Sequence, residues 1–118
     1  MTDRELLELA AKAAGIEGTW EIDTSFIQEH WYFNVPYNNH GMITGSEWNP
    51  LTDDGDAFRL AVKLKIEISH GEECNQVCAA YPNQFVGINY TIEDYTSDPY
   101  TAARRSIVRA AAEIGKLK

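Results

Sequence analysis

Three segments of this sequence carry apolar residues at every third or fourth position, and each is bounded by residues typical of helix termini. In the first segment, residues 2–14, Thr2 and Glu5 form a capping box, and Gly15 is expected to stop the helix in a left-handed conformation. An amphipathic helix buries its apolar stripe against another element. Three such stripes therefore predict a layered domain in which helices cover a sheet.

The second helix is expected to begin at Thr52 or Asp53 and the third at Ser97 or Asp98, because these side chains accept hydrogen bonds from a first helical turn. Gly115 is expected to end the third helix. The apolar stripes are Leu6, Leu9, Ala10 and Ala13 in the first helix, Ala57, Leu60, Ala61 and Leu64 in the second, and Tyr100, Ala103, Ile107, Ala110, Ala111 and Ile114 in the third.

Between the helices, five short segments are rich in β-branched and aromatic residues, and several alternate apolar with polar residues. They are residues 19–23, 30–35, 65–69, 76–81 and 85–92. The order α-β-β-α-β-β-β-α predicts a single α+β domain over residues 1–118, in which about five largely antiparallel strands form one sheet covered by three helices. Residues 36–50, which are rich in Asn and Gly, are expected to form the longest loop.

Composition narrows the class of protein. The chain has 118 residues, of which 44% are hydrophobic and 24% charged, as in ordinary globular domains. The sequence contains no run of 18 apolar residues, so a membrane span is not predicted. It also contains no basic leader followed by an apolar block, so a secretion signal is not predicted. Cys74 and Cys78 are too few and too close for a disulfide framework, which favours a reducing cytoplasm.

Charge is distributed unevenly along the chain. Residues 98–118 hold five basic and two acidic residues, which gives a net charge of +3. Because the whole chain has a net charge of −8, residues 1–97 have a net charge of −11. The basic residues are Arg104, Arg105, Arg109, Lys116 and Lys118. They are expected to pair with the acidic body, although a phosphate-binding stripe is the alternative. Nucleic acid is an unexpected partner for so acidic a chain, yet an acidic body could also imitate DNA.

No established catalytic motif is present, so an enzyme would need residues brought together by the fold. The candidate acid-base residues are His30, His40, Asp53, Asp54 and Asp56. The three aspartates could also bind a hard cation. The acidic cluster lacks calcium-loop spacing, and the start of a helix explains it. His70, Cys74 and Cys78 offer only three ligands for zinc, so neither a metal nor another cofactor is expected.

Consecutive aromatic residues at 31–33 place aromatic side chains on both faces of the expected strand. Either both faces are covered or one of them binds another chain, and the same applies to Phe85 and Tyr90. The loop after the second strand is expected to form the rim of such a surface. The residues assigned to this protein interface are Trp31, Tyr32, Phe33, Tyr37 and Trp48.

Two parts of the sequence carry a family resemblance. Residues 48–53, which read Trp-Asn-Pro-Leu-Thr-Asp, lead into a helix, and residues 98–105 begin a closing Ala-rich helix with Asp-Pro. Together they resemble small phage and prophage proteins of the phage alpha-beta-alpha sandwich type. The resemblance implies a non-enzymatic accessory protein in the cytoplasm of a bacterial host. We expect it to bind another protein or itself, with no evident small-molecule ligand. The alternatives are a small metal-dependent or acid-base enzyme and a nucleic-acid-binding or DNA-mimicking protein.

Overall fold

A computed structural model of the chain describes residues 1–23, 28–33, 46–71, 75–83, 87–95 and 98–118. Within these ranges, the side chains of residues 19, 21–23, 28–33, 46–47, 83 and 87 are not described. The elements are α1 (Asp3–Ala14), β1 (Gly18–Asp23), β2 (Gln28–Phe33), β3 (Ser46–Glu47), α2 (Asp54–Leu64), β4 (Glu67–His70), β5 (Gln76–Asn83), β6 (Gly87–Asp94) and α3 (Pro99–Lys116).

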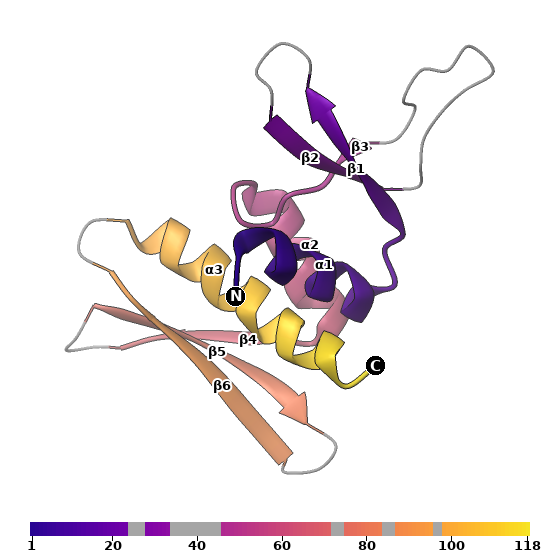
Figure 1. Cartoon of the computed structure of the whole chain (residues 1–118). Helices are drawn as coiled ribbons and strands as arrows, with labels where there is room; N and C mark the ends of the chain where they lie inside the picture. The colour runs from indigo at the N-terminus through magenta and orange to yellow at the C-terminus, as the bar shows by residue number, and fades with distance from the viewer. Residues whose placement is uncertain (24–27, 34–45, 72–74, 84–86, 96–97) are drawn as a thin grey trace.

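The strands form two antiparallel sheets of three strands, ordered β1-β2-β3 and β4-β5-β6, and the helices lie between them (Figure 1). The α+β class and the three helices are confirmed, and the last three strands pair in sequence as an antiparallel meander. The prediction of a single five-stranded sheet is wrong, because the strands form two separate sheets. In the first of them, β3 pairs with β2 through Tyr32↔Glu47 and Phe33↔Ser46. This short strand lies in the segment expected to be a loop, and α2 follows it before the second sheet begins.

The expected helix starts are confirmed by side-chain caps. Thr2 Oγ1 accepts the Glu5 N–H at 3.2 Å, and Asp53 Oδ2 accepts the Asp56 N–H at 2.8 Å. Asp98 accepts hydrogen bonds from the first turn of α3 in the same way. At the other end of α1, the N–H of Ile16 donates to Ala11 O beyond a left-handed Gly15, which has a φ of 70°.

Helix α3 is the central element of the molecule. It packs against α1 and α2 on one side and against β5 and β6 on the other. Small side chains let the neighbouring elements approach it closely, so more than a single stripe is buried. The buried residues of α3 are Ala102, Ser106, Ile107, Val108, Ala110, Ala111, Ala112 and Gly115. Tyr100, the first residue of the predicted stripe, is instead exposed.

Gly115 lies inside α3 and does not end it, because the helix continues to Lys116. A Cβ atom added at Gly115 would lie 2.1 Å from the backbone oxygen of Leu9 in α1. That separation is far below van der Waals contact, so only a glycine allows the two helix backbones to approach this closely. The prediction that Gly115 stops the helix was therefore wrong: the residue serves a helix crossing.

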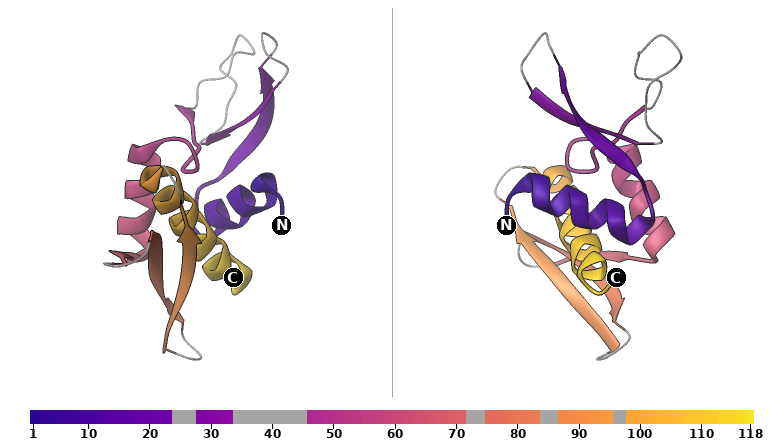
Figure 2. Two further views of the ribbon diagram at one scale, coloured as in Figure 1. Left: turned by 90° about the vertical axis from the view of Figure 1, so that its left-hand side faces the viewer. Right: turned by 45° about the vertical axis from the view of Figure 1, so that its right-hand side comes forward.

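The two sheets are attached to the helices differently. Strands β5 and β6 lie along α3, whereas β1–β3 make few contacts with any helix among the described residues and extend away from them (Figure 2). Trp20 lies at the base of β1, where its Nε1 donates to Glu8 Oε1 at 2.9 Å. The Arg4 guanidinium lies 4.9 Å from the centre of the same ring. Within the described ranges, no helix has the length and apolar character needed to cross a bilayer.

Candidate functional site

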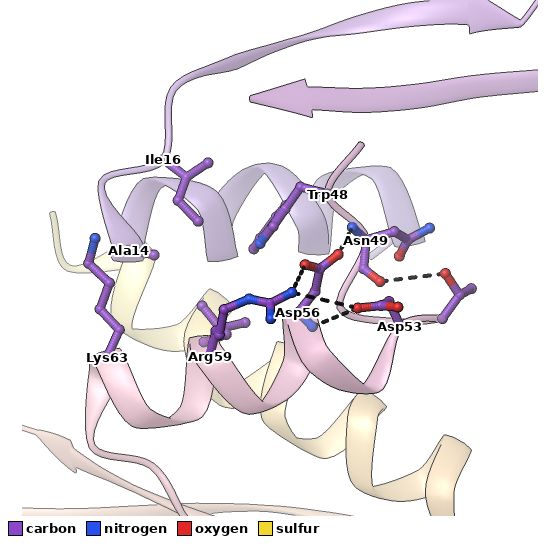
Figure 3. Close-up of a pocket in the computed structure, with 10 residues that line it drawn as sticks. Ala14, Ile16, Trp48, Asn49, Asp53, Asp56, Arg59 and Lys63 are labelled. Carbon is purple, nitrogen blue, oxygen red and sulfur yellow. Dashed lines mark hydrogen bonds and ion pairs between the residues drawn. The ribbon is translucent and has the colours of Figure 1, made fainter. Parts of the chain in front are cut away.

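A groove of about 700 Å³ lies between the end of α1, residues 48–49 and one side of α2 along its length (Figure 3). Its floor is apolar and includes Ile16 and Leu60, whereas its α2 side carries charged side chains. The lining residues are Ala14, Ile16, Trp48, Asn49, Thr52, Asp53, Asp56, Arg59, Leu60 and Lys63. The groove therefore brings together two of the five candidate acid-base residues, Asp53 and Asp56.

Both carboxylate oxygens of Asp56 are already used within the protein. Oδ2 accepts the N–H of Asn49 at 3.0 Å, and Oδ1 accepts from Arg59 Nη2 at 2.8 Å (Figure 3). The Asp56 side chain is only 12% exposed. A buried carboxylate with these partners holds the chain that precedes α2 against its first turn. Asp53 is the N-cap of the same helix, so the acidic cluster stabilises the helix start.

The remaining acid-base candidates are not placed in the groove. Asp54 forms an ion pair with Arg104 Nη1 at 2.6 Å, on a different side of α2. His40 and the side chain of His30 lie outside the described residues. Among the side chains that the structure describes, no three His, Cys, Asp or Glu residues cluster closely enough to hold a metal ion.

Two of the three residues considered as zinc ligands, His70 and Cys78, do not converge. His70 pairs with Val77 across β4 and β5, and Cys78 is the next residue along β5. Because successive residues of a strand lie on opposite faces, His70 and Cys78 lie on opposite faces of the sheet. Two side chains on opposite faces cannot bind one ion. Cys74 lies outside the described residues.

The arginines of α3 bind groups of this chain. Arg104 Nε donates to Leu51 O at 2.9 Å, in addition to its ion pair with Asp54. Arg105 pairs with Asp3 at 3.0 Å and with Glu93 at 3.3 Å, and Arg109 pairs with the same Glu93 at 3.2 Å. A phosphate group would have to replace these partners. The arrangement favours the expected pairing of a basic helix with an acidic body.

Of the residues assigned to a protein interface, Trp48 is contradicted by its position. It is 4% exposed and belongs to the hydrophobic core, so its ring packs inside the protein and cannot form the rim of an exposed surface. Tyr37 and the side chains of Trp31, Tyr32 and Phe33 lie outside the described part of the chain. The backbone of β2 is described, and there Trp31 pairs with Trp20 of β1.

A different apolar surface covers the solvent side of the second sheet. Ile88, Tyr90 and Ile92 of β6 are 64%, 63% and 52% exposed. Their register partners on β5 are Pro82, Ala80 and Cys78, which are themselves exposed or half-buried. We call these six residues the outer face: Cys78, Ala80, Pro82, Ile88, Tyr90 and Ile92. No described element covers it.

The opposite side of β6 is polar although it faces α3. Thr91 Oγ1 donates to the Ser106 O at 2.7 Å, and Ser106 Oγ donates to the Thr91 O at 3.2 Å. Further along the strand, Glu93 accepts from Arg105 and Arg109. β6 therefore buries its polar residues and exposes its large apolar ones, the reverse of a strand that covers a core.

The sequence signalled this surface only in part. The sequence offers Tyr90 as a residue on either a covered or a binding face and does not single out Ile88 and Ile92, because alternation shows that a strand has two faces without showing which one is covered. The partner of each face follows from tertiary packing. Ser106 is a polar residue in the Ala-rich helix α3. Its hydroxyl is the local signal that the polar side of β6 packs on α3 at this position.

Comparison with known proteins gives no assignment: no protein-family model, no curated protein and no solved structure matches the chain. The resemblance to phage alpha-beta-alpha sandwich proteins therefore stays a prediction that rests on the sequence.

Proposed function

We propose that this protein is a non-enzymatic binding protein that docks another polypeptide on the outer face of the second sheet. The observation that supports the proposal is the exposure of Ile88, Tyr90 and Ile92 side by side along one strand. Single exposed apolar residues are ordinary on protein surfaces, whereas contiguous ones mark interaction sites. Tyrosine is also among the residues enriched where binding energy is concentrated.

The groove beside α2 gives weaker support to the enzymatic alternative. Asp56 is engaged by Asn49 and Arg59, and Asp53 caps α2, so neither carboxylate is placed to exchange a proton with a bound substrate. The carboxylates would have to leave these partners before they could act on a substrate. The outer face is already exposed and can bind a partner without such a change. If the resemblance to phage proteins holds, the partner is a phage protein, a host protein or a second copy of this chain.

Position-specific photo-crosslinking tests the proposal. A benzophenone side chain replaces Tyr90 in a chain produced in bacterial cells, and irradiation is followed by detection of covalent adducts. Phe58 of α2 is the matched control position, because it is an aromatic residue that is 69% exposed but lies outside the outer face. We expect polypeptide adducts from position 90 that disappear when Ile92→Lys is added, and none from position 58. Equal yields at both positions, or no adduct at position 90, would contradict the proposal.

A further inference from the structure

We infer that a second copy of this chain pairs with the free edge of β6, beside the outer face, so that the two β6 strands run antiparallel about a two-fold axis at Tyr90. This pairing goes beyond the proposed function, because it uses the backbone edge of β6 and leaves the outer face exposed to another polypeptide. The β4-β5-β6 sheet of each copy would join that of the other, which gives one six-stranded sheet. The outer faces of the two copies would then form one continuous apolar surface.

The free edge of β6 presents the backbone groups that this pairing needs. β6 is an edge strand, because the sheet order is β4-β5-β6. In an antiparallel pair, backbone groups of alternate residues point toward and away from the neighbouring strand. The N–H of Tyr95 donates to Asn75 O at 3.0 Å, which continues the register of β5 and β6. Alternation from Tyr95 therefore directs the N–H and C=O groups of Ile88, Tyr90 and Ile92 toward the free edge.

A side chain confirms the direction of one of these groups. Arg109 Nη1 donates to the Ile92 O at 2.9 Å, so this carbonyl points away from β5. A carbonyl oxygen has two lone pairs and can accept a second hydrogen bond from an incoming strand. The guanidinium also forms an ion pair with Glu93 at 3.2 Å, which neutralises the negative charge of a carboxylate close to the edge.

From Gly87 to Ile92, the edge of β6 lacks the features that usually prevent strand addition. Protected edges are short or carry lysine, proline or inward-pointing charges. β6 has eight residues, and from Gly87 to Ile92 it contains no charged residue and no proline. The opposite edge strand, β4, has four residues and begins with Glu67. The two edges of this sheet therefore differ, and β6 is the one suited to pairing.

The sequence of β6 is nearly the same read in either direction about Tyr90. Residues 88–92 are Ile-Asn-Tyr-Thr-Ile, and a two-fold interface requires such self-complementarity. With Tyr90 opposite Tyr90 of the second copy, each Ile88 lies opposite an Ile92 on the outer face. On the other face, Asn89 lies opposite Thr91, which places two polar side chains together.

Charge selects this register over its neighbour. With the axis at Tyr90, Glu93 lies opposite Gly87 of the second copy, so these carboxylates do not face each other. Moving the axis to Thr91 would place Asp94 opposite Ile88 of the second copy, next to the apolar pairs. Because the whole chain carries a net charge of −8, a self-association surface has to keep carboxylates apart, and the first register does so.

A charge-complementation experiment tests the pairing. In the variant I88K/I92K, every lysine lies opposite a lysine of the second copy, whereas in I88K/I92E every lysine lies opposite a glutamate. Both positions are exposed in the single chain, and an unchanged circular dichroism spectrum shows that each variant folds. Sedimentation equilibrium gives the mass from about 1 to about 500 µM, since dimer formation follows mass action.

We expect the wild-type mass to approach twice the 13.3 kDa of the monomer. I88K/I92K should raise the dissociation constant at least about 100-fold, because like charges placed opposite each other are strongly unfavourable. I88K/I92E should dissociate within about 10-fold of the wild type, since its charges are complementary. A wild type that stays monomeric overturns the inference, as does equal weakening of both variants. Crosslinks from position 90 to another protein would support the proposed function whichever mass the wild type shows.

Discussion

The two sheets have the same number of strands and the same antiparallel pairing, yet they are stabilised in different ways. Strands β4–β6 are joined to α3 by the buried side of β5 and by the Thr91–Ser106 hydrogen bonds. Strands β1–β3 are joined to the helices chiefly at Trp20 among the described residues. A three-stranded sheet needs packing against another layer for full stability. The comparison teaches that the stability of the second sheet depends on α3, whereas that of the first depends on the contact of Trp20 with α1.

The largest effect should come from a change that breaks the comparison by affecting both sheets at once. Gly115→Ala places a Cβ atom against the Leu9 backbone and should separate α1 from α3. We expect a loss of about 3 kcal/mol in the free energy of unfolding, at the upper end of overpacking costs. Urea denaturation followed by circular dichroism measures it. Gly15→Ala is the control: no atom lies within 4 Å of its Cβ position, and its positive φ alone should cost about 1 kcal/mol.

Thr91→Val sharpens the comparison by weakening only the second sheet. The substitution keeps the shape of the side chain but removes the hydroxyl that donates to Ser106 O in a buried position. We expect a loss of about 1–2 kcal/mol. Amide hydrogen exchange should become faster in β5 and β6 and stay unchanged in β1 and β2. Thr52→Val, at an exposed threonine, should cost less than about 0.5 kcal/mol. Faster exchange in all strands would show that the two sheets open together.

Trp20→Phe should have the converse effect at the first sheet. Phenylalanine keeps most of the ring but loses the Nε1 hydrogen bond to Glu8 and weakens the contact with Arg4. A net loss of about 1 kcal/mol is expected from a hydrogen bond to a charged group at a partly exposed site. Hydrogen exchange should become faster in β1 and β2 while β5 and β6 keep their protection. Altered exchange in β6 would mean that the sheets are coupled through α1.

The smallest effect concerns the start of α3. The hydroxyl of Thr101, together with its backbone N–H, holds the pKa of Asp98 below its ordinary value, and Tyr100 N–H and Arg104 add to this. Because the pKa is lower in the folded state, the carboxylate stabilises the protein above its unfolded pKa, and this contribution disappears as the pH falls through the folded pKa. Asp98→Ser keeps a capping oxygen without a titrating group. Its melting temperature should therefore fall less than that of the wild type on acidification, and an identical fall would contradict the assignment.

Much of the local structure could be predicted, because helix boundaries depend on residues close in sequence. Thr2, Asp53 and Asp98 cap the helices at the expected positions, and the strand segments of the meander pair in sequence. The assignment of strands to sheets could not be predicted. Two residues, Ser46 and Glu47, complete the first sheet, and so short a strand has no periodicity to detect.

The candidate site was predicted less well, because exposure depends on which elements meet. Trp48 belongs to the core since the segment before α2 passes beneath α1, which aromatic content alone does not indicate. Gly115 has the composition of a helix terminator, but its role depends on Leu9, more than a hundred residues earlier. Tyr90 was recognised as an aromatic in a strand, whereas the exposure of its two isoleucine neighbours depends on the side of β6 that binds α3.

The central position of α3 has a consequence for biosynthesis. The apolar side of α1 and the inner side of β5 both pack on a helix that begins at Pro99, so neither has its cover while the ribosome is still translating the earlier codons. Nascent chains with uncovered apolar surface are prone to aggregate or to bind chaperones. Folding of this domain is therefore expected to be completed only after residues 99–116 have left the exit tunnel.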